Sequence, residues 1–266
     1  MWTRERIVED LREMRLRAGD AVLVHASMRA VGPVEGGADT LVDALIEVVG
    51  AEGVILVPSF NRRNRVNEDG LGACFELGPC REQVGILGER AAAHPDAHVS
   101  SHPTLAFSAI GRNAEFLTAS VPLHYPLGEN SPLARLYQLD GRILLIGVGH
   151  EVNAAIHLAE CWADAPYARR KATVRMEDGS IAEMEGSPEC SAGFTKIERV
   201  LRQARIIRSG YVGNAPSQSM RMQHAVSMAR EMLRGSAESL LCDNPGCAAC
   251  TLARRFTRDQ NAAGIA

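Results

Sequence analysis

The chain has 266 residues, of which 46% are hydrophobic, and its 29 basic and 32 acidic residues leave a net charge of −3. A chain of this size can bury a large core in one or two domains. The near balance of charge argues against a dedicated nucleic-acid binder, and no apolar run approaches the length that spans a bilayer. The charged, amphipathic N-terminus is unlike a signal peptide, so we expect a cytoplasmic protein with no membrane and no nucleic-acid partner.

The first sixty residues alternate between helical and strand-like segments. A helical pattern over 3–16 is followed by a strand over 21–25, a helix over 40–49 and a strand over 53–57. This order predicts an α/β fold whose central sheet is largely parallel or mixed and is flanked by helices. Because no repeat or flexible linker interrupts the chain, we expect residues 1–266 to form one compact domain.

The remaining segments continue this pattern less regularly. The polar stretch 61–81 predicts an irregular loop or lid on the functional side of the sheet. The tail from 254 onward is polar and is expected to fray. Between them we expect helices over 84–93, 133–138, 194–204 and 219–233, strands over 105–111, 142–148 and 205–212, and a hairpin over 172–185.

A strand, a glycine-rich turn and a helix follow one another between Gly141 and Pro166. Asn153 is suited to begin that helix, which carries His157 and Glu160. The end of a strand is where α/β enzymes often place chemistry. An imidazole accepts a proton near neutral pH, so His157 is the candidate general base; a core histidine bonded to backbone is the alternative.

Two other stretches contain residues suited to binding. The turn over 26–32 joins a strand to a helix, and its backbone N–H groups could hold phosphate or pantetheine amides, with a hydroxyl from Ser27 and a cation from Arg29. The segment CDNPGCAAC has the spacing of a zinc knuckle. A possible zinc-stapled segment over 240–252 would use Cys242, Cys247, Cys250 and, as the fourth ligand, Cys190; separate thiols are the alternative.

Several stretches, in order along the chain, resemble one family, the aminoglycoside 3-N-acetyltransferases, which have the antibiotic N-acetyltransferase fold. HLAE after LLIGVG is the most specific of them. The resemblance implies an α/β fold, unrelated to the histone-acetyltransferase-like fold, with acetyl-CoA as the acetyl donor. The matching stretches are LVHASMRAVGPVEGG (23–37), GVILVPSF (53–60), SSHPTLAFSAIG (100–111), ENSPLARLYQLDGRILLIGVG (129–149), NAAIHLAE (153–160) and the late CDNPGCAAC.

The resemblance also implies roles for individual residues. His157 maps onto the family's base, and a downstream glutamate that supports it maps onto Glu185 or, alternatively, Glu183. Glu160 either orients His157 or is a helix-surface charge, and we favour the surface charge. His102 either lines the coenzyme channel or is a turn residue. The implied coenzyme contacts are Ser27, Met28, Arg29, Val31 and His102, and the implied substrate contacts are Asn64, Glu68, Asp69, Asn153 and Glu160.

Two departures from the family pattern bear on the substrate. The family's threonine before the base is replaced by Ala154, which removes a hydroxyl from the helix start. Arg62, Arg63 and Arg65 stand where an acidic residue would receive a polycationic substrate. We therefore expect an acetyl-CoA-dependent N-acetyltransferase acting on the 3-amino group of aminoglycosides, as a monomer or homodimer. The alternative is the same chemistry on another small-molecule amine, such as one bearing a phosphonate or nucleotide, in biosynthesis.

Overall fold

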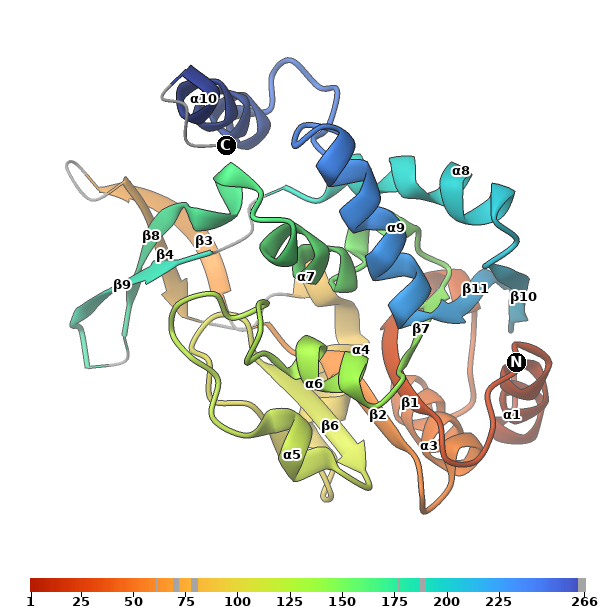
Figure 1. The fold of residues 1–266 in the computed structure, drawn as a ribbon. Helices are drawn as coiled ribbons and strands as arrows, with labels where there is room; N and C mark the ends of the chain where they lie inside the picture. Colours follow the sequence, from red (N-terminus) through yellow and green to blue (C-terminus); the bar gives the residue numbers. More distant parts are fainter. Residues whose placement is uncertain (61, 69–71, 78–80, 177, 187–189, 263–266) are drawn as a thin grey trace.

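The central sheet of this protein contains seven strands in the order β10-β11-β7-β1-β2-β6-β5 (Figure 1). The computed structural model describes residues 1–60, 62–68, 72–77, 81–176, 178–186 and 190–262. Strands β7, β1 and β2 are parallel, and β11 and β6 flank them antiparallel. The strands are β1 (Ala21–Ala26), β2 (Val54–Pro58), β5 (His98–Val99), β6 (Phe107–Gly111), β7 (Arg142–Ile146), β10 (Arg208–Val212) and β11 (Ala215–Arg221).

Helices cover both faces of this sheet, which explains why every residue of β1 is buried. Successive side chains of a strand point to opposite faces, so Leu23 packs in one hydrophobic cluster while Val22 and Val24 pack in the other. The second cluster contains side chains of α1 (Arg4–Glu13), α3 (Ala38–Val49) and α4 (Arg81–Ala93). The first contains α5 (Ala114–Thr118), α6 (Pro132–Gln138), α7 (Ala155–Trp162), α8 (Lys196–Gln203) and α9 (Met222–Gly235). The predicted α/β fold with a mixed sheet is confirmed.

A second sheet lies beside the first and has the order β3-β4-β8-β9. It consists of β3 (Arg62–Glu68), β4 (Gly72–Leu77), β8 (Lys171–Arg175) and β9 (Ile181–Glu185). The predicted hairpin over 172–185 is confirmed, but the prediction of an irregular loop over 61–81 is wrong. β4 pairs in parallel with β8, which comes far later in the chain, so the polar sequence alone could not indicate a strand.

The C-terminal part differs from expectation in two places. Residues 215–221 form a strand that pairs with β7, so α9 begins three residues later than predicted. Helix α10 (Ala248–Ala262) extends past 254 into the polar tail that we expected to fray. Among the described helices, none is long and apolar enough to cross a membrane. Short helices complete the fold: α2 (Met28–Val31), η1 (His150–Val152), η2 (Pro166–Arg169) and η3 (Ala192–Thr195).

The carboxyl ends of β1 and β7 meet at one edge of the central sheet. The Ser27 N–H donates to the Ile146 carbonyl over 2.9 Å, which joins the two turns that leave these strands. Gly147 has φ +63°, and a Cβ atom there would lie 2.3 Å from the Cβ of Ala30. Glycine therefore allows α2 to pack directly on the turn that leads to α7. This edge is where open α/β sheets bind ligands.

Candidate active site

Buried polar groups hold the beginning of helix α7. The Ala154 N–H donates to Nε2 of His25 (3.4 Å), and the Ala155 N–H donates to Oδ1 of Asn153 (3.2 Å). Asn153 Nδ2 lies 3.2 Å from Nδ1 of His150. Burial, followed by the charge of His150, lowers the pKa of His25 to about 3, so His25 is neutral and can accept this hydrogen bond. These bonds satisfy backbone donors that a helix start otherwise leaves unpaired.

Asn153 differs from the expected substrate contact. Its side chain is fully buried and its polar atoms bond to His150 and Ala155. It is inaccessible to a small molecule in this structure. The sequence interpretation of Asn153 as a helix-starting residue agrees with these contacts, which place its oxygen on a backbone donor of the first turn.

His157 lies on the first turn of α7 and is paired with Glu160. Its Nδ1 is 2.7 Å from Oε2 of Glu160, three residues later on the same helix face. The two side chains are 12% and 9% exposed, so the pair is largely shielded from water. The Phe194 ring meets the imidazole edge-on, with 4.7 Å between ring centroids. A carboxylate at Nδ1 selects the tautomer whose Nε2 lone pair is free to accept a proton.

The carboxylate paired with His157 is therefore Glu160, and our preference for a helix-surface charge there is wrong. The two downstream acids have other partners. Glu185 accepts a hydrogen bond from the Tyr125 hydroxyl (2.8 Å). Glu183 is exposed and bonds to Lys171 (2.8 Å), whose hydrogen bond and charge lower the pKa of Glu183.

A small pocket contains this pair. Tyr167 lies in the same pocket, and burial followed by the charge of Glu160 raises the pKa of its phenol. An open cleft of about 840 Å³ lies next to the pocket and shares Cys161 and Ala168 with it. That volume is in the range of small-molecule sites. The pocket is lined by His157, Glu160, Tyr167, Arg170, Cys190 and Cys250, among others. The cleft is lined by Tyr125, Tyr137, Trp162, Glu129 and Asp164, among others.

The turn expected to bind coenzyme A lies at the end of β1. Ser27 caps the short helix α2, accepting from the Ala30 N–H over 3.3 Å. Met28 is half-buried and Arg29 is exposed, so both side chains reach the surface. Val31 is fully buried in the core, so its side chain is not available to a ligand.

His102 organises a turn. It is 2% exposed, and its Nδ1 accepts from the Leu105 N–H over 3.0 Å and from the Thr104 N–H over 3.3 Å. Its Nε2 lies 3.3 Å from the Leu123 carbonyl. Of the two alternatives for His102, these contacts agree with the turn residue.

The remaining expected residues lie in the second sheet and the tail. Asn64 and Glu68 belong to strand β3, whereas Asp69 lies outside the described residues. The structure brings the four candidate metal ligands together, with their sulfur atoms all within 4.8 Å of one another: Cys190, Cys242, Cys247 and Cys250.

Sequence reasoning missed two residues that shape the site. Phe194 contacts His157 and Tyr167 lines the pocket that contains His157 and Glu160, yet no motif marks either residue as part of a site. Both are buried aromatic residues in short 3₁₀ segments outside α7. Aromatic residues in such connecting segments are a weak signal, because most of them only fill a core.

A largely buried histidine–carboxylate pair at the carboxyl edge of an α/β sheet, in a pocket that adjoins an open cleft, is typical of an enzyme that works by proton transfer. The sequence model of the family described as aminoglycoside 3-N-acetyltransferase matches residues 23–234. The chain belongs to this family. The match ends before the CDNPGCAAC segment that we had counted as part of the resemblance.

Individual relatives agree with this assignment. Aminoglycoside N(3)-acetyltransferase IV of Salmonella sp is 30% identical over 86% of each chain. Aminoglycoside N(3)-acetyltransferase VII of Streptomyces paromomycinus is 35% identical over 81% of this chain and 85% of its own. The apoenzyme structure of aminoglycoside acetyltransferase AAC(3)-IVa superposes with a TM-score of 0.84 at 29% identity, over 96% of this chain and 98% of that chain.

Two further solved structures contain ligands. A histidine-to-alanine mutant of AAC(3)-IVa, in complex with a gentamicin, has a TM-score of 0.83 at 30% identity and covers 96% of this chain and 97% of that one. AAC-IIIb in a binary complex with CoASH has a TM-score of 0.76 at 27% identity and covers 88% and 96%.

Proposed function

We propose that this chain transfers the acetyl group of acetyl-CoA to the 3-amino group of an aminoglycoside, with His157 as the general base. The observation that carries the proposal is the 2.7 Å contact between Nδ1 of His157 and the Glu160 carboxylate. Family membership supports the same reaction class. The pair occupies the first turns of a helix whose start is held rigidly, which suits a base that must meet a substrate at a fixed distance.

The reaction follows from the properties of the pair. An amine near neutral pH is mostly protonated and cannot attack a thioester. The reacting species is the neutral amine, which has already lost one proton to solvent. Its nitrogen attacks the acetyl carbonyl carbon while Nε2 of His157 accepts a second proton from it. The carbon–sulfur bond then breaks, and the proton passes to the leaving sulfur of coenzyme A. Glu160 stabilises the transient imidazolium through Nδ1.

The properties of Cys161 favour direct transfer over a covalent acyl-cysteine. Cys161 lines the pocket beside His157. Burial, followed by the charges of Glu160 and Asp164, raises the pKa of this thiol to about 12. A thiol attacks as the thiolate, so Cys161 is a poor nucleophile at neutral pH.

For acetyl-CoA, we propose the turn that begins at Ser27. It leaves β1 next to the turn after β7, and its Arg29 side chain is exposed. A cation beside a strand-to-helix turn suits the phosphates of coenzyme A. Because the side chain of Val31 is buried, any contact from that residue would come from its backbone.

For the acceptor, we propose the open cleft. Glu129 and Asp164 are exposed acids on its wall, and the rings of Tyr137 and Trp162 pack edge-to-face there, with 4.8 Å between centroids. Carboxylates attract the ammonium groups of an aminoglycoside, and aromatic rings offer apolar faces to its sugars. The three arginines at 62, 63 and 65 belong to strand β3 and not to an irregular loop.

An acceptor screen tests the proposal. Gentamicin, apramycin, kanamycin and small phosphonate amines would be offered with acetyl-CoA, following thiol release and locating the new acetyl group by NMR. We expect acetylation at the 3-amino group, and a loss of about 10²–10⁴-fold in kcat/KM for His157→Ala. His224→Ala, which changes an exposed histidine on α9, is the matched control. Turnover of phosphonate amines alone, or an unchanged rate in His157→Ala, would refute the proposal.

We also propose a cellular compartment and an oligomeric state for the enzyme. We place it in the cytoplasm, which suits the five described cysteines that are free thiols. We propose that it acts as a single-domain monomer or homodimer. A structural zinc ion is proposed separately, because its ligands are a different set of residues.

A further inference from the structure

We infer that Cys190, Cys242, Cys247 and Cys250 bind one zinc ion that holds helix α10 in place as a wall of the catalytic pocket. The four sulfur atoms lie within 4.8 Å of one another, although they come from three separate parts of the chain. Cys190 lies between β9 and η3, Cys242 follows α9, and the other two lie at the start of α10. All four are free thiols in the structure.

The arrangement fits the geometry of a four-thiolate site. A tetrahedral zinc with Zn–S bonds of about 2.3 Å separates its sulfur atoms by roughly 3.8 Å. Only small shifts of the four side chains would therefore bring their sulfur atoms to bonding distance from one ion. The Cys242 N–H donates to Sγ of Cys250 over 3.4 Å. Backbone donors of this kind orient metal-bound thiolates and offset their charge.

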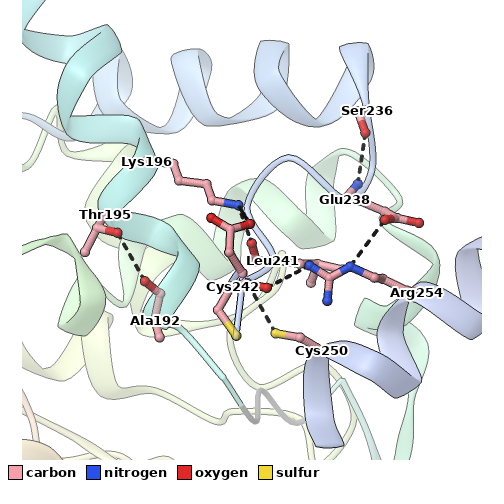
Figure 2. Close-up of polar contacts among 10 residues, drawn as sticks. Ala192, Thr195, Lys196, Ser236, Glu238, Leu241, Cys242, Cys250 and Arg254 are labelled. Carbon is pink, nitrogen blue, oxygen red and sulfur yellow. Dashed lines mark hydrogen bonds and ion pairs between the residues drawn. The ribbon is translucent and has the colours of Figure 1, made fainter. Parts of the chain in front are cut away.

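Charged side chains fix the loop that carries Cys242. Arg254 donates to the Cys242 carbonyl (2.7 Å) and pairs with Glu238 (3.4 Å), and Lys196 donates to the Leu241 carbonyl (2.7 Å) (Figure 2). Figure 2 also shows the sulfur atoms of Cys242 and Cys250 turned toward the same space. These contacts therefore hold the loop with its thiol facing the other ligands.

The packing of α10 explains why an ion would be needed there. The hydrophobic cluster beneath α10 contains six buried residues, and two of them are Cys242 and Cys250. Leu252 and Phe256 of α10 are both 38% exposed. So small a cluster gives a weak hydrophobic attachment, and a metal bound by separate segments supplies the missing constraint. Three of the four ligands lie beyond residue 234, where the match to the family model ends.

The site would be structural and not catalytic. Four protein thiolates complete a tetrahedral zinc shell and leave no position for water or substrate. Its effect on the enzyme would be indirect, because Cys190 and Cys250 line the same pocket as His157 and Glu160. Loss of the ion would free one wall of that pocket.

Metal analysis of the full-length protein tests the inference. Protein purified without a metal-affinity step would be denatured, and the released zinc measured with a chromogenic chelator and by mass spectrometry. We expect about one zinc per chain, and less than a tenth of that for Cys247→Ser. Cys247→His should retain the ion, because imidazole replaces thiolate in structural zinc sites. The matched control is Cys161→Ser, which removes a thiol from the same pocket but outside the cluster.

Hydrogen exchange tests what the ion does. Removing zinc with a chelator should raise amide exchange across 248–262 more than tenfold, while α7 and the central strands keep their protection. If the serine variant does not fold, a second experiment takes its place. Cobalt is added to wild-type protein from which zinc has been removed, and it should give the intense absorption of tetrahedral thiolate coordination. Absence of zinc from the wild-type protein, disulfides among these cysteines, or unchanged exchange after zinc removal would overturn the inference.

Discussion

The pocket around His157 has two helical walls, α7 and α10, and they are built in different ways. Helix α7 packs on the central sheet within the largest hydrophobic cluster, and buried hydrogen bonds hold its first turn. Helix α10 packs on a small separate cluster, and polar contacts and cysteine sulfurs connect it to the body. The difference shows that the hydrophobic core of the fold positions His157, the proposed base, whereas the wall formed by α10 depends on a few local contacts.

The largest expected difference between the walls is in stability. Leu158 of α7 is fully buried in the main cluster, whereas Leu252 of α10 is 38% exposed. Leu158→Ala should lower the free energy of unfolding by about 2–5 kcal/mol, because it leaves a cavity in a packed core. Leu252→Ala should change it by less than about 0.5 kcal/mol. Urea unfolding followed by circular dichroism measures both, and similar losses would mean that the two walls are equally embedded.

The second difference concerns the acid that supports the base. Glu160→Gln keeps the size of the side chain but removes the charge beside His157, so kcat should fall by about ten- to a hundredfold with KM little changed. Glu185→Gln affects an acid bonded to Tyr125 and should cost less than about threefold. Measuring kcat and KM of both variants across pH decides which of the two acids supports His157. A larger loss in Glu185→Gln would restore the acid suggested by the family resemblance.

The pH dependence of stability should report on the α7 wall. His25 has its pKa lowered to about 3 in the folded protein, while an exposed histidine titrates near 6.5. As pH falls below about 6.5 the unfolded chain binds a proton that folded His25 does not, so stability falls by up to about 1.4 kcal/mol per pH unit. His25→Gln keeps an acceptor for the Ala154 N–H without titrating. Urea unfolding between pH 7 and 5 should show a shallower decline for this variant, and an identical decline would exclude His25 as the source.

The smallest expected effects come from changing two acids of the open cleft, which belong to neither helical wall. Glu129→Gln and Asp164→Asn should each raise KM for a polycationic aminoglycoside by about two- to fivefold, because exposed ion pairs contribute little. Asparagine tolerates the positive φ of 51° at position 164. Added salt should reduce the difference from wild type. Unchanged KM values at low salt would place the substrate's ammonium groups elsewhere.

Local patterns in the sequence predicted which segment carries His157 better than they predicted which residues and strands pair with it. The apolar run before Gly147 and the helix after it identified the segment that carries His157, because both depend on neighbouring residues. Glu160 was misjudged because its spacing from His157 indicates only a shared helix face, and not whether that face is buried. Strands β3 and β4, which pair with each other, were missed because their sequence is polar and because β8, the strand that joins them to the rest of the second sheet, is remote in the chain.

The sequence by itself determined the alternation of helices and strands and the cysteine spacing, since these depend on residue type and short-range order, and it made His157 the candidate base. Only the tertiary structure decided which carboxylate meets the imidazole and where the four sulfurs converge. Glu160 is buried in a pocket that α7 shares with Cys190 and α10, and Cys190 lies near the other cysteines because Gly193, three residues later, packs directly against the backbone of Leu241 and Cys242. Contacts between distant segments set burial and charge pairing, and these in turn set what each functional side chain can do.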